Sequence, residues 1–214
     1  MNLLLLLFYV VLWGLVLVLF LYILSAISSG GYGPRTRQKL MDKLDELKSG
    51  LVPLGLEELR ELALSQSYVT NKRGSHGFLS TIFQEPILVF VYKNFPSGKV
   101  LLAKSAHKVY ELREQEVDIK VSINGDRYRM DKTGNLSKKL PSDEILYTLD
   151  CNSYPEYDVI MKSETALAYL KTESSEDKHE RFFSMFGDVS EEDVDGLIIL
   201  VLYHTFINSK NNIR

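Results

Sequence analysis

The side chains that could carry out chemistry are few and widely spaced. The sequence has four histidines and one cysteine, and no two of them stand at a spacing that binds a metal ion. A nucleophilic Cys151 would need a histidine brought to it by the fold. The residues that could form such a catalytic site are Cys151, His107 and the Asp and Glu groups. The sequence therefore favours a protein that is not an enzyme, with no cofactor and no metal. An enzyme whose site is assembled from distant side chains is the alternative.

Segments that could bind phosphate, calcium or nucleic acid are also weak. The basic loop 71–77 is not followed by a phosphate-loop helix, and Lys99 lacks a preceding glycine at the required spacing. Residues 173–195 hold nine acidic and two basic residues, too irregularly placed for a calcium loop. This run is typical of a solvated loop and helix start, and a docking surface for a basic partner is the alternative. With a net charge of −3, we expect no nucleic-acid partner.

Residues 3–24 form an apolar run that Gly14 alone interrupts. As a helix the run would reach about 33 Å, which matches a hydrocarbon core of about 30 Å. A cleaved signal peptide is the competing interpretation, because small residues follow at 25–30. Against it, the run is longer than a typical signal segment and no basic residue precedes it. Since the basic residues follow the run, we expect an integral membrane protein with one span and a cytoplasmic C-terminal domain.

Residues 28–52 are predicted to be a linker followed by an amphipathic juxtamembrane helix. The linker is rich in Ser and Gly, and a helix at 35–49 would place Leu40, Leu44 and Leu47 on one stripe. Its basic side chains could meet anionic lipid. The residues assigned to this membrane interface are Arg35, Arg37, Lys39 and Lys43. We favour the alternative that the helix is a spacer or packs on its own domain, because its apolar stripe is short and its polar face is mixed in sign.

Residues 53–214 are expected to form a β-rich domain that begins with a short helix at 53–67. Apolar and polar residues alternate from 117 to 123, and Asn124 and Gly125 supply the pair that a type I′ turn requires. This segment is predicted as a β-hairpin, which a turn at 131–135 extends. Further strands are expected at 87–93, 99–104, 108–113, 145–150, 157–162, 166–171 and 181–186. Short strands between turn residues favour an antiparallel sheet or barrel.

The C-terminal helix, predicted over 191–207, decides the expected architecture. Ser190 and the acidic residues after it resemble a capping box, and 196–203 is apolar on every side. The apolar stretch of about 12 residues falls short of the roughly 20 that a second span requires. The predicted fold class is therefore an N-terminal transmembrane helix at 1–27 plus a mainly-β (α+β) domain, in which an antiparallel β-barrel or strongly curled sheet surrounds the hydrophobic C-terminal helix.

A chain of about ten to twelve short antiparallel strands that ends in a hydrophobic helix resembles the Tubby C-terminal, LURP-one and phospholipid-scramblase superfamily. The resemblance covers residues 78–207 and includes the acidic and apolar run at 193–200. It implies a non-enzymatic module, often at a membrane and sometimes lipid-binding. We accordingly expect a non-catalytic cytoplasmic domain that binds an anionic lipid or a protein partner near the membrane. A membrane-tethered enzyme and a structural assembly subunit are the alternatives.

Overall fold

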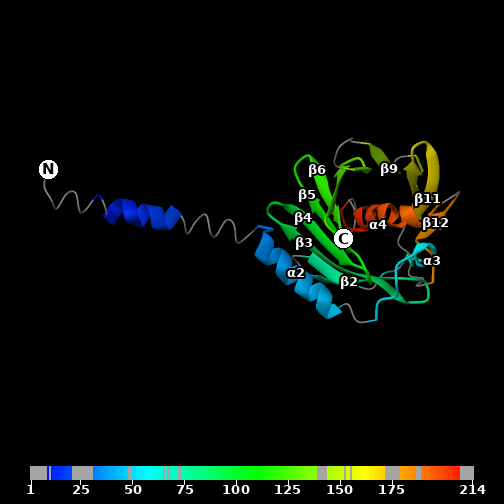
Figure 1. Ribbon diagram of the computed structural model, residues 1–214, viewed down its shortest axis with the longest axis horizontal. Coiled ribbons are helices and arrows are strands. Elements are labelled where there is room, and N and C mark those ends of the chain that lie inside the picture. The colour runs from blue at the N-terminus through cyan, green and yellow to red at the C-terminus, as the bar shows by residue number, and fades with distance from the viewer. Residues whose placement is uncertain are drawn as a thin grey trace.

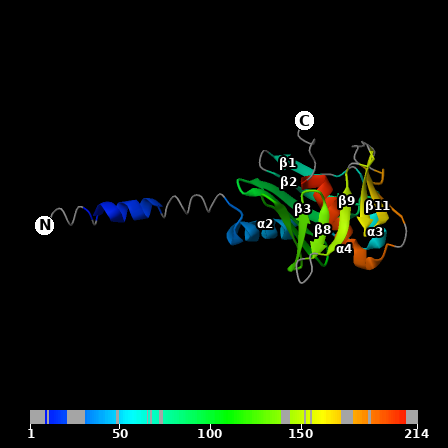
Figure 2. The same cartoon turned by 90° about the horizontal axis from the view of Figure 1, so that it is seen from above.

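The computed structural model describes residues 9, 11–20, 31–47, 50–64, 66, 68–71, 74–138, 144–151, 153–154, 156–171, 179–186 and 189–207. From residue 31 on, this described part is a β-rich domain with helix α2 (Pro34–Leu47) on the outside of one sheet and helix α4 (Val194–Leu202) inside its curve (Figure 1). The view from above shows the same arrangement, with α4 between β3 and β11 (Figure 2).

The predicted membrane span is corrected by the structure. Helix is described at residues 9 and 11–20, and the rest of the predicted run 3–24 lies outside the described residues. In the part of the chain that the structure describes, none of the helices combines the length and the apolarity needed to cross a membrane. The predictions of a transmembrane helix and of a single-pass membrane protein with a cytoplasmic domain were therefore wrong.

Twelve antiparallel strands form one sheet and follow each other in chain order. Their bounds are β1 (Tyr68–Asn71), β2 (Gly74–Ser80), β3 (Pro86–Phe95), β4 (Gly98–Lys104), β5 (Val109–Glu114), β6 (Asp118–Ile123), β7 (Asp126–Asp131), β8 (Asn135–Lys138), β9 (Ile145–Asp150), β10 (Tyr157–Lys162), β11 (Thr165–Lys171) and β12 (Phe183–Met185). The predicted hairpin is confirmed as β6 and β7, and Asn124 and Gly125 between them have φ of 51° and 100°. By contrast, the predicted loop 71–77 contains the end of β1 and the start of β2.

The sheet is open, which corrects the predicted barrel. Among the described strands, β1 pairs with β2 alone and β12 with β11 alone. The segment after helix α3 (Leu56–Arg60) lies between the end of β2 and the residues before β12, where Leu62 bridges Thr81 and Ala63 bridges Arg181. This irregular segment therefore lies between β2 and β12, which do not pair with each other. The fold is mostly β, one open antiparallel sheet with few helices, in place of the predicted membrane helix and closed barrel.

Helix α2 packs on the outer face of the sheet. Leu40 and Leu44 are buried against a second cluster that includes Val89, Val91 and Leu102 of β3 and β4. The favoured interpretation, a helix packed on its own domain, is confirmed. Helix α3 is shorter than the helix predicted at 53–67, because Leu62 and Ala63 form β-bridges.

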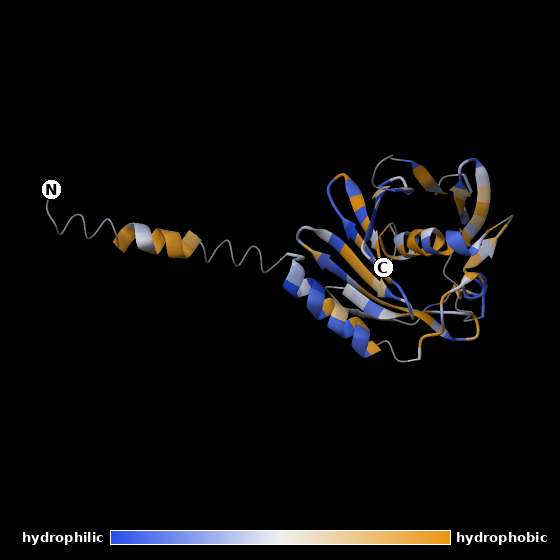
Figure 3. Ribbon diagram, viewed as in Figure 1, coloured by the Kyte–Doolittle hydropathy of each residue, from blue (hydrophilic) through white to orange (hydrophobic). Residues whose placement is uncertain are grey.

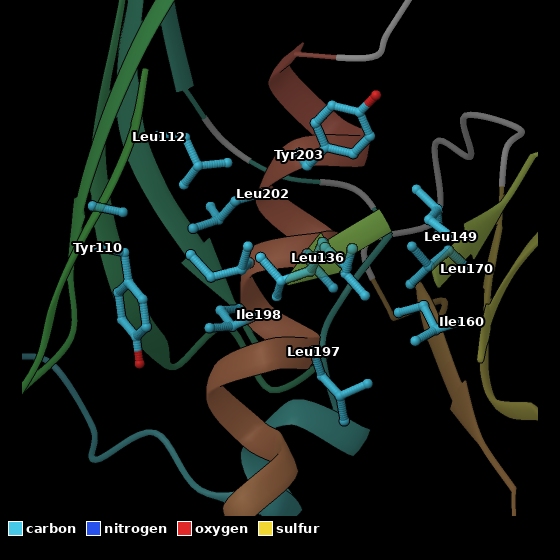
Figure 4. Close-up of a cluster of buried hydrophobic side chains, with 14 of the residues drawn as sticks. Tyr110, Leu112, Leu136, Leu149, Ile160, Leu170, Leu197, Ile198, Leu202 and Tyr203 are labelled. Atoms are coloured by element: carbon cyan, nitrogen blue, oxygen red, sulfur yellow. The ribbon is translucent and has the colours of Figure 1, made fainter. Parts of the chain in front are cut away.

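Helix α4 follows a short 3-10 turn η1 (Glu191–Asp193) and continues into a π-helical turn η2 (Tyr203–Ile207). Every residue of α4 except Asp195 is buried, as its apolar composition predicts. In Figure 4, Ile198 and Leu202 face Tyr110 and Leu112 of β5, while strands β10 and β11 contribute Ile160 and Leu170 on the other side of the helix. Figure 3 shows that α4 is hydrophobic along its length and hydrophilic at its acidic start.

Candidate functional site: a basic row on the outer face of the sheet

Two carboxylates hold the start of the buried helix, and the first is Asp193. It is 1% exposed. Its Oδ1 accepts hydrogen bonds from Lys162 Nζ at 2.5 Å and Tyr147 Oη at 2.7 Å, and its Oδ2 accepts from the backbone nitrogen and Oγ of Ser190 at 2.9 and 2.8 Å. Burial disfavours the charge, yet these hydrogen bonds hold the pKa of Asp193 well below its usual range. Asp193 is therefore a charged and fully bonded anchor.

The second carboxylate, Asp195, is held in the same way from the other side of the helix. Lys108 Nζ donates to it at 2.7 Å and Tyr110 Oη at 2.9 Å. Burial, and then the charge of Asp195, raise the pKa of Tyr110. Since Tyr110 belongs to β5 and Tyr147 to β9, the two carboxylates tie the start of α4 to both halves of the sheet. Their bonding capacity is used inside the domain, which indicates a structural role.

A histidine and an aspartate meet beyond the other end of α4. His204 Nε2 donates to Asp158 Oδ2 at 2.9 Å, and the side chains are 15% and 7% exposed. Among the described residues, His204 Nδ1 is buried without a hydrogen-bond partner. The pair ties η2 to β10.

Cys151 and His107, the two residues named as candidates for a catalytic site, lie near opposite ends of α4. Cys151 lies near Tyr203, just beyond the C-terminal end of the helix. Burial, and then the charge of Cys151, raise the pKa of Tyr203 to about 12. A hydrogen bond from Cys151 Sγ goes to the Leu149 carbonyl at 4.0 Å. His107 is exposed and precedes Lys108, which bonds Asp195 at the start of the helix. The structure therefore does not bring the two together.

The outer face of the sheet carries a row of cations. The strand register places Lys93, Val100, Arg113, Lys120 and Arg129 directly opposite one another across β3 to β7. Directly opposed residues point to the same face, with Cβ atoms about 4.5–5.5 Å apart. That face is the outer one, because the alternate residues of these strands fill the core around α4. We call Lys93, Arg113, Lys120 and Arg129 the basic row, and Arg127 lies on the same face beside it.

Only part of this charge is compensated within the domain. Arg129 Nε pairs with Asp118 at 2.8 Å. Arg113 lies over the ring of Tyr32 and Lys93 over the ring of Phe95, each 5.4 Å from the ring centroid. Among the described side chains, no carboxylate forms an ion pair with any of three cations on this face. They are Arg113, Lys120 and Arg127.

The four residues predicted at the membrane interface are distributed around α2. Arg37 Nε donates to Glu111 at 2.9 Å, and this hydrogen bond raises the pKa of Arg37. Lys43 is half-buried near His76, whose pKa is lowered by burial and then by the Lys43 charge. Arg35 and Lys39 are exposed. The structure thus brings Arg37 beside the basic row and places the others elsewhere on the helix, and their contact with lipid stays a prediction.

Several described residues of the acidic run at 173–195 form ion pairs inside the domain. Outside the run's undescribed parts, Glu180 pairs with Lys171, and Arg181 pairs with Glu61 at 2.7 Å. Asp193 and Asp195 hold α4. Among the described acidic residues of the run, Glu180, Asp193 and Asp195 are thus paired with lysines of the domain. Residues 173–178 and 187–188 of the run lie outside the described residues.

The basic row is the site that reasoning from the sequence missed. Only one of its pairs could be derived locally, because the Asn124–Gly125 turn sets Lys120 opposite Arg129. The alternation of polar and apolar residues on β5 puts Arg113 on the polar face, but it does not say which residue of β6 stands opposite. That neighbour depends on the length of the β5–β6 turn.

The fold and the site define an open antiparallel sheet wrapped on a buried C-terminal helix, with a cationic outer face beside α2. No protein-family model, curated protein or solved structure matches the chain. Function is therefore argued from the side chains themselves.

Proposed function

We propose that this protein is a non-catalytic binding domain whose outer sheet face binds anionic phospholipid headgroups. The observation that carries the proposal is the basic row. Like charges directly opposite on neighbouring strands repel and cost stability. Asp118 relieves this repulsion at Arg129, and an anion held between Arg113, Lys120 and the neighbouring Arg127 would relieve it between Arg113 and Lys120. The oxygens of one phosphate group can accept hydrogen bonds from several guanidinium and ammonium groups at the same time.

A diffuse anionic surface suits this face better than a folded protein partner does. The centre of a protein interface is poor in lysine and is built on aromatic side chains or arginines in pockets. Here the aromatic ring of Tyr32 lies beneath Arg113, and its hydroxyl donates to Glu111 at 2.8 Å. A Lys or Arg near an anionic lipid surface contributes about 1 kcal/mol and needs no pocket. The interaction proposed is with headgroups at a surface.

The test is vesicle co-flotation of the full chain with phosphatidylcholine vesicles that contain or lack phosphatidylserine. The comparison isolates charge, because any apolar contribution is common to both vesicles. We expect preferential binding to the phosphatidylserine vesicles and weaker binding at high salt. A triple variant with Arg113→Gln, Lys120→Gln and Arg127→Gln should weaken this binding by about a hundredfold, at about 1 kcal/mol for each cation removed.

A matched variant separates position from net charge. Arg60→Gln, Lys132→Gln and Lys138→Gln remove the same charge from exposed cations outside the row, so this variant should bind nearly as the wild type does. Equal loss in the two variants would contradict a localised site, as would a wild type that ignores phosphatidylserine. If oligoglutamate bound through the row while vesicles did not, the partner would be an acidic protein. Thermal unfolding of each variant checks that the fold is retained.

A further inference from the structure

Four aromatic rings gather on the outer face of the last three strands. Tyr169 of β11 stands at their centre, with ring centroids 4.4 Å from Phe186, 6.2 Å from Tyr157 and 6.3 Å from Tyr154, all in edge-to-face geometry. We call these four residues the aromatic patch. Tyr154, Tyr157 and Phe186 remain 53%, 37% and 45% exposed. Large apolar side chains that gather on a surface mark an interaction site more often than single exposed residues do.

The aromatic patch is separate from the basic row. The register places Tyr169 opposite Val159 on one side and Ser184 on the other, on the outer face. The alternate residues Leu170 and Phe183 belong to the core. Figure 1 shows β11 and β12 across α4 from β4 and β5. The two surfaces therefore lie on different halves of the sheet.

Carboxylates lie beside the aromatic patch, and the lysine next to it is paired. Asp150 stands opposite Val159, in the same cross-strand row as Tyr169, and Glu156 is exposed next to Tyr157. The nearest cation in register is Lys171, opposite Tyr157, and it is paired with Glu180. An aromatic surface edged by carboxylates is complementary to a cation, because both the ring faces and the carboxylates attract positive charge.

We propose that the aromatic patch is a docking surface for an arginine-rich segment of a partner protein. Guanidinium groups stack on tyrosine faces, because they are planar and weakly hydrated, and their remaining N–H groups can reach carboxylates. The chain already contains this arrangement, since Arg113 lies over the Tyr32 ring while that ring's hydroxyl is bonded to Glu111. At the aromatic patch, the partner supplies the guanidinium, and Glu156 and Asp150 are the carboxylates that lie beside the rings.

The test measures binding of a fluorescent oligoarginine peptide to the full chain by anisotropy. Removing two rings with Tyr157→Ser and Phe186→Ser should weaken binding about tenfold, as expected for two exposed cation–π contacts. The conservative variant Tyr157→Phe with Phe186→Tyr keeps both rings and should retain binding. Phe83→Ser is the control, because Phe83 is 68% exposed in the turn between β2 and β3 and makes no ring contact with the aromatic patch among the described residues.

Several results would overturn the proposal. One is an unchanged oligoarginine affinity in the Ser variant. Another is tighter binding of oligoproline or oligoglutamate than of oligoarginine. A concentration-dependent dimer that the Ser variant abolishes would make a second copy the occupant. If the Ser variant fails to fold in thermal unfolding, Glu156→Gln carries the test, and unchanged affinity at low salt in that variant would refute the role of charge. None of these results depends on the vesicle experiment.

Discussion

The packing of Tyr147 on α4 predicts that an alanine at Gly196 destabilises the protein. A Cβ at this position would lie 2.3 Å from Tyr147 Cε2 and 2.8 Å from both Cδ2 and Cζ, distances that real Cβ atoms essentially never show. The ring has little room to move, because it is 7% exposed and its hydroxyl is bonded to Asp193 at 2.7 Å. Gly196→Ala must therefore displace the ring or the helix.

The size of the effect follows from three opposing contributions. Alanine in a helix is favoured over glycine by about 1 kcal/mol. Overpacking a buried position costs about 1–3 kcal/mol. Losing a hydrogen bond to a charged carboxylate costs about 1.5–3 kcal/mol. The sum is a loss of about 1.5–5 kcal/mol in the free energy of unfolding, opposite in sign to the helix propensity.

Urea unfolding followed by far-ultraviolet circular dichroism measures this loss as a lower midpoint. A double-mutant cycle with Tyr147→Leu tests the cause, because the smaller side chain makes room for the new methyl group. We expect Gly196→Ala to cost much less in the Tyr147→Leu background than in the wild type. A Gly196→Ala protein as stable as the wild type would refute the reasoning, and so would additive effects of the two substitutions.

Two further predictions concern pH. The folded pKa of Asp193 is depressed, so the stability it contributes is present above its unfolded pKa of about 3.9 and is lost as the pH falls through the lower folded value. Asp193→Asn should flatten the acid side of the urea midpoint plotted against pH, and an unchanged acid profile would contradict this. Burial, followed by the Cys151 charge, raises the pKa of Tyr203 from 10.0 to about 12. The stability that results from this shift is present below pH 10 and is lost as the pH rises from 10 to about 12. The Tyr203→Phe variant should therefore lose less stability than the wild type over this range. Parallel plots of the urea midpoint against pH for the two proteins would refute the prediction.

Local patterns predicted those parts of the fold in which the determining residues are neighbours in sequence. The hairpin β6–β7 depends on alternation and on two turn residues that accept positive φ. The burial of α4 follows from a run that is apolar around the whole helix. In both cases the physical cause lies within about a dozen residues, so no tertiary information is required.

Other parts depended on contacts between distant segments. Leu62 and Ala63 continue a helical pattern, yet they form β-bridges to Thr81 and Arg181 because the fold brings them beside the end of β2 and the residues before β12. Strand β2 was missed since its glycines weaken any strand pattern. One of them is required: a Cβ at Gly74 would lie 2.1 Å from the Tyr92 carbonyl oxygen of the neighbouring strand.

The amino-acid sequence by itself determined a β-rich chain with an enclosed C-terminal helix, because hydrophobic periodicity is a local property of the backbone geometry. Only the tertiary structure decided that the sheet stays open, that two Asp–Tyr–Lys contacts hold α4, and that cations from β3 to β7 stand in one row. Side-chain direction alternates within each strand and is readable from the sequence. The residue opposite on the next strand depends on register across turns of differing length, which the alternation does not contain.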